Sequence, residues 1–109
     1  MSEQKPSQML RKAWALIDAP EKWTQSAFAR DYNGTQVTIL NEDATCFCSL
    51  GALIKSNDGF DEAAKEYLNR PTGGIVNYND THTWPEVKAA WMKAIALAAE
   101  DEAKNETNR

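Results

Sequence analysis

The sequence predicts an α+β domain that is mainly α, with about four helices packed around a buried central helix and one small β-hairpin. Three observations lead to this class. An almost unbroken apolar run fills 44–54 and has helix punctuation on both sides. Asn33-Gly34 is the dipeptide of a tight hairpin turn. Thr83 and Glu86 have the spacing of a capping box before a long segment of helical periodicity.

The size of the chain fits one domain with a real core. It has 109 residues, of which 42% are hydrophobic, so disulfide or metal staples are not required. We expect a disordered lead at 1–6, a single globular domain at 7–100 and a polar tail at 101–109.

The charge and the chain ends limit the classes of function. A net charge of −4, with scattered Lys and Arg, gives nucleic acid no general attraction. No secretory leader and no membrane-spanning apolar run are visible. We therefore expect a cytoplasmic protein that binds neither nucleic acid nor membrane and whose two cysteines stay reduced.

The first helix is expected over 8–18, with Ser7 as its cap. Its apolar residues recur three or four positions apart and are Leu10, Ala13, Trp14 and Ile17. Pro20 then breaks the pattern and opens a short helical turn that carries Trp23.

A hairpin is expected over 26–40, around the Asn33-Gly34 turn. Val37 and Ile39 alternate with polar residues on its return strand. For 24–30 a helix remains the alternative to a strand, because Ala and Phe at its centre are not strong strand formers together.

The apolar run is expected to form the central helix over 44–55, capped by Asp43 and ended by Asn57–Gly59. In a helix, Cys46 and Cys48 point roughly 200° apart, so they share neither a metal nor a disulfide. A strand would instead place both thiols on one face. Gly51 is expected where another element approaches closely.

Two helices complete the prediction. One covers about 60–69 and ends at Pro71, with Phe60, Ala64, Tyr67 and Leu68 directed inward. A loop follows, with a short strand at Ile75-Val76. The last helix begins at Thr83 and has Pro85 in its first turn, where a missing N–H costs nothing.

Several short motifs together resemble a known family. They are the segment from Trp23 through Ala29-Arg30-Asp31 to Gly34, the segment Ala44–Leu53, the pair Asn79-Asp80 and the segment Trp84–Val87. In this order they resemble an uncharacterised family of small bacterial and phage proteins, which implies a bacterial or phage origin. Phe47 stands where that family usually has Trp, and Trp84-Pro85 replaces a commoner polar pair. The resemblance implies no activity.

The best polar cluster is 77–83, just before the start of the last helix. It offers amide, carboxylate, imidazole and hydroxyl groups, and a helix N-terminus favours anions. The residues that we expect to take part in a ligand site are Trp23, Arg30, Asn79, Asp80 and His82.

The sequence contains no recognisable catalytic or metal-binding set, and no cofactor is implied. We therefore expect a non-catalytic protein-interaction module, with a phage-encoded modulator of a host protein as one form of it. Its partner would be a host or cellular protein. The alternative is a binder of a small anionic, nucleotide-like ligand at the cluster above. An enzyme that uses Cys46 or His82 is the least favoured hypothesis.

Overall fold

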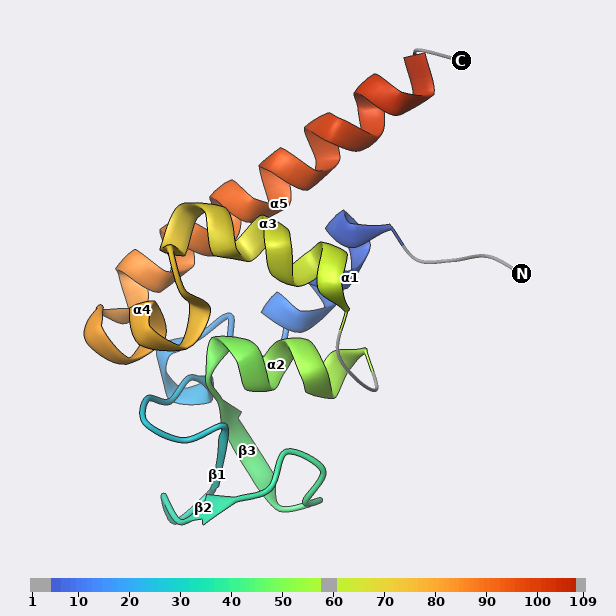
Figure 1. Ribbon diagram of the computed structural model, residues 1–109. Coiled ribbons are helices and arrows are strands. Elements are labelled where there is room, and N and C mark those ends of the chain that lie inside the picture. The colour runs from blue at the N-terminus through green and yellow to red at the C-terminus, as the bar shows by residue number, and fades with distance from the viewer. Residues whose placement is uncertain (1–4, 58–60, 108–109) are drawn as a thin grey trace.

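The structure is a computed structural model that describes residues 5–57 and 61–107 (Figure 1). Along the chain, helices precede and follow a small sheet. In chain order the elements are α1 (Pro6–Trp14), the 3₁₀ turn η1 (Pro20–Lys22), β1 (Ala29–Asp31), β2 (Gln36–Val37), β3 (Ala44–Phe47), α2 (Ser49–Ser56), α3 (Glu62–Thr72), α4 (Ile75–Thr81) and α5 (Trp84–Thr107). The α+β class with mainly helical content is confirmed. The described residues contain five α-helices rather than about four.

The helices form one side of the molecule and the small sheet forms the other (Figure 1). α1 packs against α2, α3 and α5, and α3 packs along α5. The core between them is apolar, and its largest member is the fully buried Trp91. Trp91 contacts Trp14, whose ring also stacks on Trp84 at 6.1 Å between centroids. The three tryptophans join α1 to the first half of α5.

The sheet has three antiparallel strands in the order β2-β1-β3. The predicted hairpin is confirmed by the pairing of β1 with β2 around a turn in which Gly34 has φ +82°. Asp31 stabilises this turn because its Oδ1 accepts the N–H groups of Asn33 and Thr35, each at 2.9 Å. Residues 24–28 form neither a strand nor a helix.

The prediction of a central helix over 44–55 is wrong. Residues 44–47 are strand β3, in which Phe47 lies opposite Ala29 of β1, and the helix begins only at Ser49. Asp43 is not its cap, because it sits in a turn where its N–H donates to Asn41 Oδ1 at 2.7 Å. The available partner strand β1 therefore decided the conformation of an apolar run that would fit a helix equally well.

Other helix boundaries also differ from those predicted. α1 starts and ends earlier than predicted, and Lys5 rather than Ser7 is its N-cap residue. Ser7 is instead buried, and its hydroxyl donates to Glu102 Oε1 of α5 at 2.6 Å. Residues 101–107, expected as a polar tail, continue α5.

The region after Phe60, a residue that lies outside the described part, is more helical than predicted. α3 continues through Pro71 to Thr72, and its C-cap Gly73 has the left-handed φ of +71°. The segment expected as loop and strand at Ile75-Val76 is helix α4. The capping box is confirmed, because Glu86 Oε1 accepts Thr83 N–H at 2.9 Å and Thr83 Oγ1 accepts Glu86 N–H at 3.4 Å.

Candidate functional site

A polar network joins α4 to the irregular segment 23–28 and to the start of α2. Asn79 of α4 lies at its centre and is 1% exposed. Its Oδ1 accepts three hydrogen bonds, from Trp23 Nε1 at 2.7 Å and from the N–H and hydroxyl of Ser49 at 2.9 Å each. Its Nδ2 donates to Thr24 O at 3.0 Å. The amide of Asn79 is therefore fully used inside the protein, and it acts as a structural hub.

Asp80 extends this network to the surface. Its Oδ1 accepts the N–H of Ser26 at 2.9 Å and Asn79 Nδ2 at 3.1 Å. Ser26 has φ +64°, a conformation that is costly for a residue other than glycine. The neighbouring Gln25 donates through Nε2 to the carbonyl oxygens of Asn79 and His82. These bonds to α4 hold the segment in its strained turn.

Arg30 of β1 stabilises the same segment through hydrogen bonds. Its guanidinium donates to Thr24 Oγ1 at 2.9 Å, to Gly34 O at 3.0 Å and to Gln25 O at 3.2 Å. Each of the three guanidinium nitrogens thus donates to an oxygen of the fold, a geometry that fits a structural clamp.

His82 ends α4 and stacks on Tyr78, with 3.7 Å between ring centroids. Its Nδ1 lies 3.0 Å from both Tyr78 O and Thr81 Oγ1. The imidazole is thus held against its own helix, and it is not among the residues that line the pocket described next.

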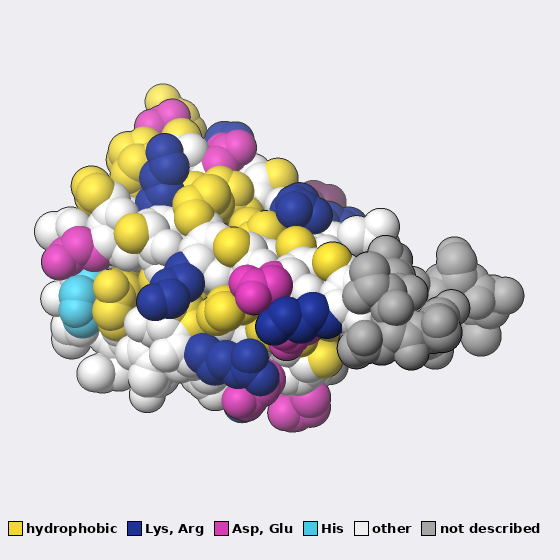
Figure 2. Space-filling view, turned by 90° about the horizontal axis from the view of Figure 1, so that it is seen from above, with side chains coloured by type: hydrophobic (Ala, Val, Ile, Leu, Met, Phe, Trp, Pro, Cys, Tyr) yellow, Lys and Arg dark blue, Asp and Glu magenta, His cyan; other side chains and the backbone are white. Residues whose placement is uncertain are grey.

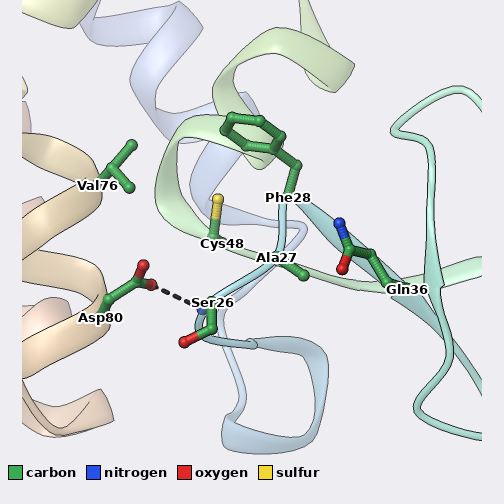
Figure 3. A pocket seen from close by; sticks show the side chains of 7 residues that line it. All are labelled: Ser26, Ala27, Phe28, Gln36, Cys48, Val76 and Asp80. Carbon is green, nitrogen blue, oxygen red and sulfur yellow. Dashed lines mark hydrogen bonds between the residues drawn. The ribbon is translucent and has the colours of Figure 1, made fainter.

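A pocket of about 420 Å³ opens beside this network (Figure 3). Asp80 and Val76 of α4 form one side of it, and Phe28 and Gln36 come from the sheet side. Cys48 lies between them with its sulfur toward Val76 and Phe28. The full lining consists of Ser26, Ala27, Phe28, Gln36, Cys48, Val76 and Asp80.

Cys48 is the N-cap of α2, and its sulfur accepts the N–H of Gly51 at 3.3 Å. Burial raises the pKa of this thiol, and the negative charge of Asp80 raises it further against the lowering effect of the helix N–H groups. The thiol is therefore neutral near pH 7, unlike a reactive thiolate at a helix N-terminus.

Cys46 lies in different surroundings, because its thiol donates to the carbonyl of Glu21 at 3.2 Å. Both thiols are free. They face different partners because one belongs to a strand and the other caps a helix, and not because they lie on opposite sides of one helix. Among the described residues, no group of three or more His, Cys, Asp or Glu side chains is arranged to hold a metal ion.

Gly51 of α2 lets the backbone of Phe28, a lining residue of the pocket, approach the helix closely. A Cβ at this position would collide with the carbonyl oxygen of Phe28, which accepts the N–H of Cys48 at 3.2 Å. The prediction of a close approach at Gly51 is confirmed, and the element that approaches is the residue before β1.

Of the residues that line this pocket, only Asp80 is among the site residues predicted from the sequence. The structure joins Trp23, Asn79 and Asp80 directly, and it ties Arg30 and His82 to them only through Thr24 and Gln25. The sequence pattern places Cys48 in the central helix, Phe28 in a strand or its helical alternative, and Val76 in a short strand within a loop, so it does not bring the three residues together. The sequence shows Phe28 as a large apolar residue between two alanines, but no pattern in it places Cys48 and Val76 beside this residue.

A sequence model of the family of unknown function DUF6197 matches residues 1–97. The chain belongs to this family. No curated protein and no solved structure matches it significantly. Within the described ranges, the chain contains no helix with the length and apolar composition needed to cross a bilayer.

Proposed function

We propose that this protein is a non-catalytic protein-interaction module that binds its partner at Phe28 and the two hollows beside it, which we call the Phe28 surface. The first hollow is the pocket above. The second, of about 620 Å³, is lined by Phe28, Gln36, Val37, Thr38 and Ile39. Phe28 and Gln36 belong to both hollows, so the two adjoin.

The observation that carries the proposal is the exposure of Phe28, which is 47% accessible. A large apolar side chain in water costs free energy, and contiguous apolar area is typical of docking sites. Its backbone is fixed on both sides, by Cys48 N–H at its carbonyl and by the bonds of Ser26 and Arg30 nearby. A preformed aromatic anchor loses little entropy on binding, which favours its use as a hot spot.

The chemistry of the pocket gives less support to an enzyme. The titratable side chains among its lining residues are Asp80 and the neutral thiol of Cys48. A carboxylate beside an un-ionised thiol provides no activated nucleophile.

The anionic-ligand hypothesis is also less well supported. Asp80 carries the charge among the lining residues, and Arg30 directs its donors to three oxygens of the fold. An anion in this pocket would meet a negative carboxylate without a compensating cation.

The net charge of −4 and the charge pattern on the face shown in Figure 2 favour a protein partner over nucleic acid. On the face shown in Figure 2, Lys and Arg side chains are interspersed with acidic and apolar ones. Such a surface lacks the continuous basic area that tracks a phosphate backbone. A host or cellular protein is the partner that we propose, and the phage-encoded modulator remains one form of this proposal.

A photocrosslinking residue placed at position 28 tests the proposal in cells. Met92 on α5 is 40% exposed and provides a control of similar exposure. We expect position 28 to yield one discrete adduct that position 92 does not yield. Identical adducts from both positions, or none from position 28, would contradict the proposal.

A further inference from the structure

The charge and shape of the first hollow specify the chemistry of what it receives. This inference rests on the function proposed above and adds the nature of the partner. We propose that the pocket beside Phe28 takes a Lys or Arg side chain from a partner segment, which pairs with Asp80, while an adjacent apolar side chain of that segment packs on Phe28 and the second hollow.

Asp80 lines the pocket, and its two carboxylate oxygens differ in their hydrogen bonds. Its Oδ1 accepts hydrogen bonds from Ser26 N–H and from Asn79 Nδ2, which anchor this oxygen. Within the described part of the chain, no hydrogen bond or ion pair engages its Oδ2. The dashed bond in Figure 3 runs from the carboxylate to Ser26, and the group lies at the pocket edge. A cationic donor can thus add to a carboxylate that is already oriented.

The other lining residues fit the rest of a long basic side chain. Val76, Ala27 and Phe28 provide apolar walls, against which the methylene stem of Lys or Arg packs while its charged end reaches a polar group. Gln36 and Ser26 offer neutral hydrogen-bonding groups at the same pocket. The thiol of Cys48 adds no charge that would compete with Asp80.

In this proposal, the cation that pairs with Asp80 comes from the partner and not from Arg30. Arg30, on the neighbouring strand, directs its donors to Thr24, Gln25 and Gly34. The net charge of −4 also attracts a basic partner over longer distances.

The second hollow favours a segment of a partner chain over a free amine as the ligand. It shares Phe28 and Gln36 with the pocket and is also lined by the apolar side chains of Val37 and Ile39. A partner segment with a basic residue next to an apolar one can fill both hollows at once, and each additional buried apolar group adds affinity.

The test is a selection of random displayed peptides on the whole protein, with Phe28→Ser as a counter-selection. We expect the enriched peptides to require Phe28 and to carry Lys or Arg beside an apolar residue. Labelled peptides from the selection are then titrated into variants. Asp80→Asn keeps an oxygen for Ser26 N–H but removes the charge, and we expect it to weaken binding by about tenfold or more.

A second pair of variants keeps the test decisive if Asp80→Asn does not fold. Val76→Lys places a positive charge at the wall of the pocket, at a side chain that is 39% exposed. Met92→Lys adds the same charge on α5 at similar exposure. We expect the first change to weaken binding by about tenfold and the second to leave it within about twofold.

The outcomes separate the two proposals. Peptides that require Phe28 but lack basic residues, or that bind Asp80→Asn or Val76→Lys as tightly as the wild type, would overturn this inference and leave the Phe28 surface as a docking site. Failure to enrich any peptide that requires Phe28 would overturn both.

Discussion

The indole N–H of Trp23 donates to Oδ1 of Asn79 at 2.7 Å, across 56 positions of the chain. This bond connects the end of the 3₁₀ turn to α4. Because Ser49 bonds the same oxygen and also accepts the indole N–H of the core Trp91 at 3.0 Å, the link runs from the surface segment into the helical core. The position of Asp80 and of the Phe28 surface follows from this link.

Replacement of Asn79 by Ala is expected to destabilise the protein strongly. The change leaves Trp23, Ser49 and Thr24 with buried polar groups that have lost their partner, and each such group costs about 1–3 kcal/mol. We expect a loss of at least about 3 kcal/mol in the free energy of unfolding, measured by urea denaturation. Asn77→Ala, at an exposed position of the same helix, should change it by less than about 0.5 kcal/mol. Similar small losses for both variants would contradict the role of Asn79 as a hub.

Gly51→Ala is expected to disrupt the contact between α2 and the residue before β1. The new methyl group meets the backbone carbonyl of Phe28, which cannot rotate away. Overpacking of this kind costs about 1–3 kcal/mol, although alanine is the better helix former. A thermal midpoint equal to or above that of the wild type would show that the two elements are not held so closely.

Two substitutions at Asp80 separate its hydrogen bonds from its charge. Asp80→Ala removes the acceptor of Ser26 N–H, whereas Asp80→Asn retains an oxygen there. We expect the alanine variant to be less stable than the asparagine variant by about 1 kcal/mol, measured by denaturant unfolding. Equal stability of the two variants would mean that Ser26 does not depend on this acceptor.

The capping box should make a contribution that depends on pH. Hydrogen bonds from the backbone and hydroxyl of Thr83 lower the pKa of the Glu86 carboxyl. A lowered folded-state pKa means that the stabilisation is fully present above the unfolded pKa of about 4.3 and is lost as the pH falls through the folded value. The stability difference between the wild type and Glu86→Gln should therefore shrink on acidification from neutral pH to below about 4. A difference that grows in this window would show the opposite sign of the shift.

The Cys48 thiol should react slowly in the folded protein. Cys48 is 2% exposed and its pKa is raised by burial, so little thiolate is available to a disulfide reagent near pH 8. In Cys46→Ser, we expect native Cys48 to react at least about tenfold more slowly than the same thiol in denaturant. Equal rates in the folded and unfolded protein would place the thiol in an open, ionisable setting and revive a catalytic hypothesis.

The sequence by itself determined the features that depend on residues a few positions apart. The capping box of Thr83 and Glu86 and the turn at Asn33-Gly34 form as predicted, because their hydrogen bonds and backbone angles are local. The mainly helical α+β class follows from the same signals. Among the proposed site residues, the cluster before α5 contributed Asp80 to the pocket, and Asn79 beside it.

Only the tertiary structure decided the rest. The run 44–54 fits both a helix and a strand, and pairing with β1 chose strand up to Phe47, while Cys48 became the cap of α2. α4 contains few strong helix formers, and its conformation depends on burial of Ile75 and Asn79. Asn79 bonds Ser49, Thr24 and Trp23 across 30 to 56 positions of the chain, and no local pattern encodes such pairs. The pocket beside Phe28 exists because these distant hydrogen bonds bring α4, α2 and the sheet to one place.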